Sequence, residues 1–153
     1  MSKVILMIDD DRSERGLFEE AIKKVGSDIT CYLAEGGKEA LEIMSNKDNI
    51  LPKVIFLDIN MPEMSGWVLL KNLKENETYK DIPVIMYSTS SYQRDIDMAM
   101  QFGAVSFCVK PENFKLLIKI VEFISNNLDG DLPNAIRQNK EGIENFKGGI
   151  KVV

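Results

Sequence analysis

The sequence predicts an α/β fold in which helices cover both faces of a parallel sheet. Five short apolar runs alternate with five amphipathic segments, a pattern typical of right-handed crossovers between parallel strands. Four of the runs are followed directly by polar residues, which in a parallel sheet would all lie at one edge. We therefore expect a doubly wound, three-layer (βα)5 sandwich with a five-stranded sheet.

The five strand candidates are short and rich in aliphatic residues. Three of them are continuously apolar, as strands buried on both faces are, whereas the second alternates and the fifth contains Ser106. They cover residues 4–8 (VILMI), 29–34 (ITCYLA), 54–57 (VIFL), 84–87 (VIMY) and 105–109 (VSFCV). Pro52 and Pro83 precede the third and fourth runs, where a break between elements is expected.

The five helix candidates carry apolar residues at spacings of three and four, which places them on one helical face. The first covers residues 12–25, and Asp11 or Ser13 is expected to cap its start. Gly103 is expected to end the fourth. The other four are outlined by apolar positions within 40–44, 68–73, 96–102 and 114–124.

Composition limits the class of protein. A chain of 153 residues, 44% hydrophobic and 28% charged, fits one soluble globular domain. The net charge of −5 and the lack of a basic stripe argue against a nucleic-acid partner. No apolar run approaches the roughly 20 residues that span a bilayer, and the first run is too short for a signal peptide. We therefore expect a cytoplasmic protein with no membrane partner.

The chain has no histidine, which excludes histidine-based catalytic triads, histidine general bases and histidine-rich metal sites. Any phosphohistidine chemistry would need a histidine on another protein. The two cysteines, Cys31 and Cys108, are too few for a disulfide framework or a zinc site.

Polar side chains follow four strands: Asp9 and Asp10 the first, Asp58 the third, Ser88 the fourth and Lys110 the fifth. Converging carboxylates repel one another unless a cation joins them, and ligands that are all oxygen suit Mg²⁺. With the metal bound, Asp58 can attack a phosphoryl donor while Lys110 and Ser88 contact the phosphoryl oxygens. A simple capping role for Asp58 does not predict this convergence.

The motifs MIDDD, FLDINMPEMSG, PVIMYSTS and FCVKP, in this order, resemble those of the receiver domain of bacterial two-component response regulators of the stand-alone type. The resemblance covers about residues 3–128. It implies a flavodoxin-like fold with strand order 2-1-3-4-5. It also implies a phosphoprotein that receives its phosphoryl group from a sensor histidine kinase or a histidine phosphotransfer protein, is not an enzyme, and acts on an unknown downstream protein.

The resemblance also assigns roles to residues of the site. Asp58 matches the phosphoacceptor, and Asp9 and Asp10 match the acidic pair. Asp10, Asp58 and the backbone carbonyl of Asn60 would bind Mg²⁺ directly, while Asp9 would act through water. By the same resemblance, the implied strand order places both cysteines on opposite edge strands, too far apart for a disulfide.

Ser88 and Lys110 match the family's hydroxyl and lysine, with Thr89 and Ser90 as weaker candidates for the hydroxyl. Phe107 matches its switch aromatic, which turns inward when Ser88 moves, although a hydrophobe of an edge strand is the simpler role. The resemblance also implies a cis peptide bond before Pro111.

Three alternatives are weaker. An Asp-nucleophile phosphatase would, by its family pattern, have a second Asp where this chain has Asn60. A flavin-binding module needs a phosphate cradle after the first strand, where Asp9, Asp10 and Asp11 would repel phosphate. Residues 129–153 are too few for a DNA-binding domain. Their glycines weaken any helix, so we expect a loosely ordered extension and not a docking element.

Overall fold

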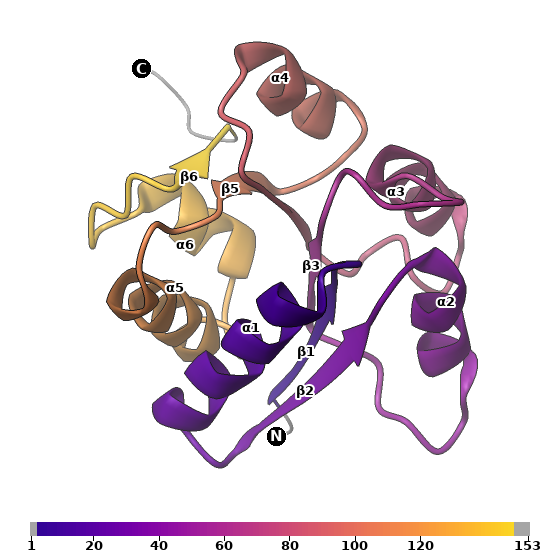
Figure 1. Ribbon diagram of the computed structural model, residues 1–153, viewed down its shortest axis with the longest axis horizontal. Coiled ribbons are helices and arrows are strands. Elements are labelled where there is room, and N and C mark those ends of the chain that lie inside the picture. The colour runs from indigo at the N-terminus through magenta and orange to yellow at the C-terminus, as the bar shows by residue number, and fades with distance from the viewer. Residues whose placement is uncertain (1–2, 149–153) are drawn as a thin grey trace.

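Five parallel strands form the centre of the computed structural model, which describes residues 3–148 (Figure 1). Their order is β2-β1-β3-β4-β5, which confirms the predicted order. A short sixth strand, β6 (Phe146–Lys147), pairs antiparallel with β5 and is absent from the prediction. The parallel strands are β1 (Lys3–Ile8), β2 (Ile29–Ala34), β3 (Val54–Leu57), β4 (Val84–Ser88) and β5 (Ser106–Val109).

Helices cover both faces of this sheet (Figure 1). The residues of β1 and β3 alternate between the two hydrophobic cores, and almost all are fully buried. Their continuous apolar runs reflect this burial on both faces. One face carries α1 (Arg12–Val25), α5 (Phe114–Asn126) and α6 (Leu132–Gln138), and the other carries α2 (Gly37–Ser45), α3 (Gly66–Glu75) and α4 (Gln93–Gln101).

Side-chain caps determine where three of the helices, α1, α3 and α5, begin. Asp11 caps α1, because its carboxylate accepts hydrogen bonds from the N–H groups of Ser13 and Glu14 at 2.8 and 3.4 Å. Ser65 caps α3 and Asn113 caps α5 in the same way. The loops after β1, β3 and β5 therefore end at fixed residues.

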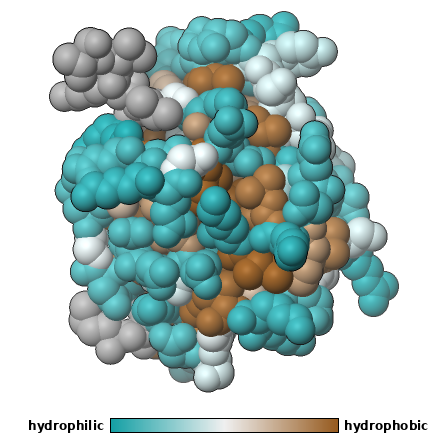
Figure 2. Space-filling view, turned by 90° about the vertical axis from the view of Figure 1, so that its left-hand side faces the viewer, coloured by the Kyte–Doolittle hydropathy of each residue, from teal (hydrophilic) through white to brown (hydrophobic). Residues whose placement is uncertain are grey.

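The C-terminal segment, residues 129–148, is not the loosely ordered extension expected. It forms α6 and β6 and packs beside α5 (Figure 1). Figure 2 looks onto this side of the molecule and shows mostly hydrophilic side chains, with apolar ones between them. Four side chains of the segment are buried in the core shared with α1 and α5: Leu132, Ile136, Ile143 and Phe146.

The glycines of this segment do not weaken its helix because they lie outside it. Gly142 and Gly148 have φ of 65° and 73°, values that favour glycine, and they form turns around β6. Asn139 closes the loop between α6 and β6. Its side chain accepts a hydrogen bond from the N–H of Ile143 at 3.0 Å and donates one to the carbonyl of Ile143 at 2.8 Å. Gly149 lies outside the described residues.

Strand β6 covers the outer side of β5, so β5 is not the edge strand that the sequence suggested. Phe107 is opposite Lys147, and Cys108 is opposite Phe146. Cys31 and Cys108 are both free thiols, as expected. Burial raises the pKa of Cys31 to about 12 and also raises that of Cys108, which fits inert packing residues.

The peptide bond before Pro111 is trans, since no peptide bond in residues 3–148 is cis. The cis bond expected from the resemblance is therefore wrong for this chain. Trans is the isomer that X–Pro bonds favour by about 0.5–1 kcal/mol.

Replacement of Phe146 by Ala tests whether the C-terminal segment is part of the core. The Phe146 ring is 1% exposed, and its centroid lies 5.6 Å from that of Phe123 in α5. We expect Phe146→Ala to lower the free energy of unfolding by about 3 kcal/mol, measured by urea denaturation. A loss below about 0.5 kcal/mol would contradict this packing, since that is the effect of an ordinary surface substitution.

Candidate functional site

The carboxyl ends of four strands meet at one edge of the sheet, as predicted. The register aligns Ile8 of β1 with Leu57 of β3, so the aspartates that follow these residues are neighbours. One carboxylate oxygen from each of Asp9, Asp10 and Asp58 lies within 4.8 Å of the others. We call these three residues the carboxylate cluster.

Lys110 connects β5 to the carboxylate cluster. Its Nζ donates a hydrogen bond to Oδ2 of Asp9 at 2.8 Å and lies 3.7 Å from Oδ1 of Asp58. Nζ also lies 5.6 Å from the centroid of the Tyr87 ring. Burial lowers the pKa of Lys110, but the hydrogen bond to Asp9 and the charges of Asp58 and Asp9 outweigh it and raise the pKa. Lys110 therefore presents a protonated ammonium to both carboxylates.

Asp58 lies in an environment that disfavours its ionised form. Burial and the charge of Asp9 raise its pKa from the ordinary 3.8 to about 6, against the opposing effect of Lys110 and of a backbone hydrogen bond from Ile59. Asp10 adds a smaller repulsion. Additional positive charge near Asp58 would relieve this repulsion, so the geometry favours a divalent cation.

The raised pKa of Asp58 predicts how stability depends on pH in the absence of metal. Between the ordinary pKa of 3.8 and about 6, the folded chain holds a proton that the unfolded chain has lost. Stability therefore falls as pH rises through this range. We expect Asp58→Asn to be more stable than the native chain at about pH 7 in EDTA, and the difference to shrink below about pH 4. Thermal unfolding at both pH values tests this, and a less stable variant at about pH 7 would contradict it.

Gly66 holds the loop after β3 against the backbone of Asp58. Its N–H donates to the carbonyl of Ile59 at 2.8 Å, and a Cβ at this position would overlap the backbone oxygen of Asp58. No side chain fits here without moving Asp58. Asn60 is exposed in the same loop, and its proposed contact with a metal remains a prediction.

The three hydroxyls at the end of β4 and just after it are in different environments. Ser88 is buried, and its Oγ accepts a hydrogen bond from the N–H of Ser90 at 3.1 Å. The hydroxyl of Ser90 donates to Oδ2 of Asp95 in α4 at 2.8 Å, so it is already engaged. Thr89 is exposed. Phe107 is fully buried in the core with α4, and its switch role also remains a prediction.

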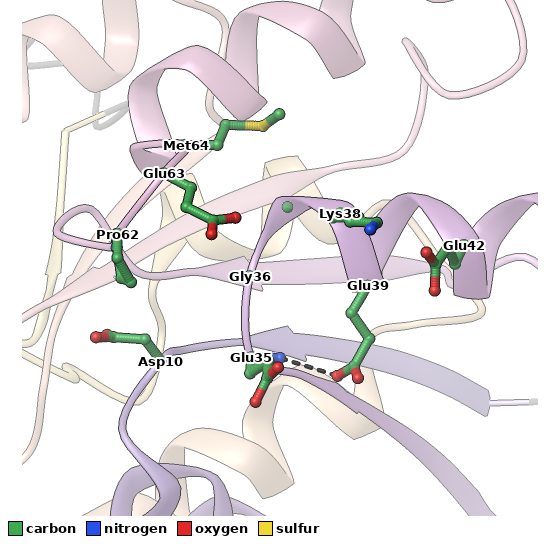
Figure 3. Close-up of a pocket in the computed structure, with 10 residues that line it drawn as sticks. Asp10, Glu35, Gly36, Lys38, Glu39, Glu42, Pro62, Glu63 and Met64 are labelled. Carbon is green, nitrogen blue, oxygen red and sulfur yellow. Dashed lines mark hydrogen bonds between the residues drawn. The ribbon is translucent and has the colours of Figure 1, made fainter.

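An acidic cavity of about 650 Å³ opens beside the carboxylate cluster. Figure 3 shows Asp10 and Glu63 across from Glu35 and Glu39, with the N–H of Glu35 bonded to Oε1 of Glu39 at 3.0 Å. Lys38 is the basic residue among those that line it. The excess of carboxylates raises the local concentration of cations next to Asp10.

Comparison with known proteins decides the family. The model of the response regulator receiver domain matches residues 5–122. The chain belongs to this family. A relative among curated proteins is the chemotaxis protein CheY homolog of Campylobacter jejuni. It is 28% identical over 127 residues, which cover 83% of this chain and 95% of that protein.

Solved structures confirm the flavodoxin-like fold of this receiver domain. The Mn²⁺-bound form of response regulator Rcp1 has a TM-score of 0.71 at 27% identity and covers 82% of this chain and 93% of its own. The phosphorylated cyanobacterial phytochrome response regulator RcpA has a TM-score of 0.72 at 26% identity and covers 80% and 90%. This chain is thus a signalling domain of the two-component type, a family that accepts phosphoryl groups from histidine kinases.

None of the receiver domain's helices in residues 3–148 combines the length and hydropathy needed to cross a bilayer.

Sequence reasoning missed residues that fix the backbone of the site. Arg15 donates from Nη1 to the backbone oxygen of Asp9 at 2.8 Å. Gly66, the last residue of the motif FLDINMPEMSG, leaves room for the backbone of Asp58 because it has no Cβ. Asn145 bonds to Val109, next to Lys110, across a sequence separation of 36 residues. Periodicity and strand-end motifs carry no signal for such contacts, because each depends on the folded arrangement.

Proposed function

We propose that this receiver domain accepts one phosphoryl group on Asp58 in a Mg²⁺-dependent reaction and thereby changes a protein-binding surface. The observation that carries the proposal is the position of Lys110. Its ammonium lies 2.8 Å from Asp9 and 3.7 Å from Asp58, where it can contact a phosphoryl group joined to Asp58.

The carboxylate cluster fits a magnesium ion. Both oxygens of Asp9 are engaged, one by the N–H of Asp11 at 2.9 Å and one by Lys110. Asp10 and Asp58 are therefore the candidates for direct ligation, joined by the carbonyl of Asn60, while Asp9 would act through water. Bound there, Mg²⁺ supplies positive charge that stabilises the ionised carboxylates and the phosphoryl oxygens.

The donor must be another protein or a small phosphodonor, because this chain has no histidine. A sensor histidine kinase or a histidine phosphotransfer protein fits the family. As an oxygen of Asp58 bonds to phosphorus, the phosphorus–nitrogen bond of the donor's phosphohistidine breaks, and its electron pair stays on the imidazole. Lys110 and the hydroxyl of Ser88 then contact the phosphoryl oxygens.

Phosphorylation would add about −1.5 to −2 charges next to Asp9 and Lys110. Ser88 Oγ accepts a hydrogen bond from Ser90 and donates none to another of residues 3–148, so its hydroxyl can turn toward the new oxygens. That movement, together with Phe107, would alter the surface of α4, β5 and α5, which a downstream protein reads. The proposal also includes a cytoplasmic location and no nucleic-acid partner, consistent with the net charge of −5.

Single replacement of two neighbouring aspartates by asparagine tests the proposed role of Mg²⁺. Because Asp10→Asn loses a direct ligand, we expect it to need at least about tenfold more Mg²⁺ for half-maximal phosphorylation by phosphoramidate. Intact-mass spectrometry measures the extent of phosphorylation. Asp11→Asn is the matched control. Asp11 caps α1, and Asn caps helices equally well, so its Mg²⁺ requirement should not change.

Each part of the proposal can fail separately. Loading of the native chain at the same rate in EDTA would contradict the role of the metal. Absence of loading in a folded native chain, with both phosphoramidate and acetyl phosphate as donors, would contradict the function as a whole.

A further inference from the structure

The C-terminal segment reaches the functional site at Val109, the residue before Lys110. The N–H of Val109 donates to the backbone oxygen of Asn145 at 2.9 Å. The side-chain amide of Asn145 donates from Nδ2 to the carbonyl of Val109 at 2.7 Å. One residue outside the matched region, 5–122, thus binds both backbone polar groups of Val109.

Lys110 is held from the opposite side by β4. Its N–H donates to the carbonyl of Ser88 at 2.7 Å. The dipeptide Val109–Lys110 is therefore fixed between β4 and the C-terminal segment. The Lys110 side chain extends from this point to Asp9 and Asp58, so a displacement of its backbone moves Nζ relative to both carboxylates.

Asn145 has a defined position because its neighbours are anchored. Ile143 is 2% exposed and Phe146 is 1% exposed, and Asn139 bonds both backbone groups of Ile143. Further along, the backbone of Gly148 lies against the side chain of Met100 in α4. The segment therefore connects α4, β5 and α5, the elements expected to form the signalling surface.

We infer that Asn145 is a positioning residue for phosphoryl transfer, acting through Val109 on Lys110. The inference rests on the proposed phosphorylation of Asp58 and deepens it. Asn145 places the ammonium of Lys110 where the phosphoryl oxygens arrive.

The test compares two side chains that tie the same segment to β5. Asn145→Ala removes the hydrogen bond to the carbonyl of Val109. Ser106→Ala removes the bond from Ser106 Oγ to the carbonyl of Lys147, 3.1 Å long, which is remote from Lys110 in the strand. We expect Asn145→Ala to slow loading by phosphoramidate at saturating Mg²⁺ about three- to tenfold, the effect of one lost hydrogen bond. We expect Ser106→Ala to load at the native rate.

A double-mutant cycle shows whether Asn145 acts through Lys110. In a Lys110→Ala background, Asn145→Ala should have no further effect on the loading rate, because the group that it positions is missing. If loading of the Lys110 variants is too slow to measure, the affinity for beryllofluoride in the presence of Mg²⁺ gives the same comparison at equilibrium. It is measured for the native chain, the two single variants and the double variant.

The outcomes separate this inference from the proposed function. The positioning role would be overturned by any of three results: Asn145→Ala loads at the native rate, Ser106→Ala slows loading equally at matched stability, or the two substitutions in the cycle act independently. Each of these results would leave the phosphorylation of Asp58 standing. A folded native chain that neither loads nor binds beryllofluoride would overturn both.

Discussion

Asp58→Asn is expected to abolish phosphoryl loading of this receiver domain. The carboxylate of Asp58 is the nucleophile in the proposed reaction, and an amide in its place cannot form the acyl phosphate. The substitution keeps the shape of the side chain and removes one charge from the carboxylate cluster, so the variant should fold. Intact-mass spectrometry after incubation with phosphoramidate and Mg²⁺ measures the loss directly.

Asp11→Asn is the control for this experiment as well, because Asp11 lies two residues beyond Asp9 and its side chain caps α1. It should gain one phosphoryl group as the native chain does. Stoichiometric loading of Asp58→Asn would show that another side chain accepts the phosphoryl group and would refute the assignment.

Lys110→Ala is expected to slow loading by about 10²- to 10³-fold, the usual effect of removing one group that stabilises charge in a transition state. The ammonium of Lys110 is the side-chain cation closest to Asp58 among the described ion pairs. The same variant leaves the fully buried Asp9 without its ion-pair partner. We therefore also expect the free energy of unfolding to fall by about 3 kcal/mol in EDTA.

Lys53→Ala is the matched control for the second effect. Lys53 pairs with Asp129 at 2.6 Å, but both side chains are partly exposed, at 29% and 42%. Lys53→Ala should lower the free energy of unfolding by less than about 1 kcal/mol, as is usual for the loss of a surface ion pair. Equal destabilisation by both variants would contradict a special role for the buried pair, and native loading by Lys110→Ala would contradict its catalytic role.

The receiver fold could be predicted because its strands carry an unambiguous pattern. Val54–Leu57 is continuously apolar because both faces of β3 are covered. The residue that follows this run, Asp58, lies at the carboxyl edge of the sheet. The same holds for β1 and Asp9. A parallel sheet brings such strand ends together without any further information, so the carboxylate cluster and Lys110 were predicted from residues and order alone.

The C-terminal segment could not be predicted in this way. Ile136, Ile143 and Phe146 have spacings compatible with a single helix, but they belong to α6, a loop and β6. They are buried in the core shared with α1 and α5, which forms only in the folded chain. A two-residue strand has no pattern of its own, and the pairing of Asn145 with Val109 depends on tertiary structure. The roles of Asn60 and Phe107 likewise rest on the family resemblance and not on a local pattern.

Reductive trapping of the loaded native chain tests the central claim most directly. Borohydride converts the acyl phosphate of an aspartate into homoserine, which peptide mass spectrometry locates in the sequence. We predict homoserine at position 58 alone, only after incubation with both phosphodonor and Mg²⁺. Homoserine at position 9 or 10, or a stable phosphoryl group on Ser88 that resists hydroxylamine, would contradict the account.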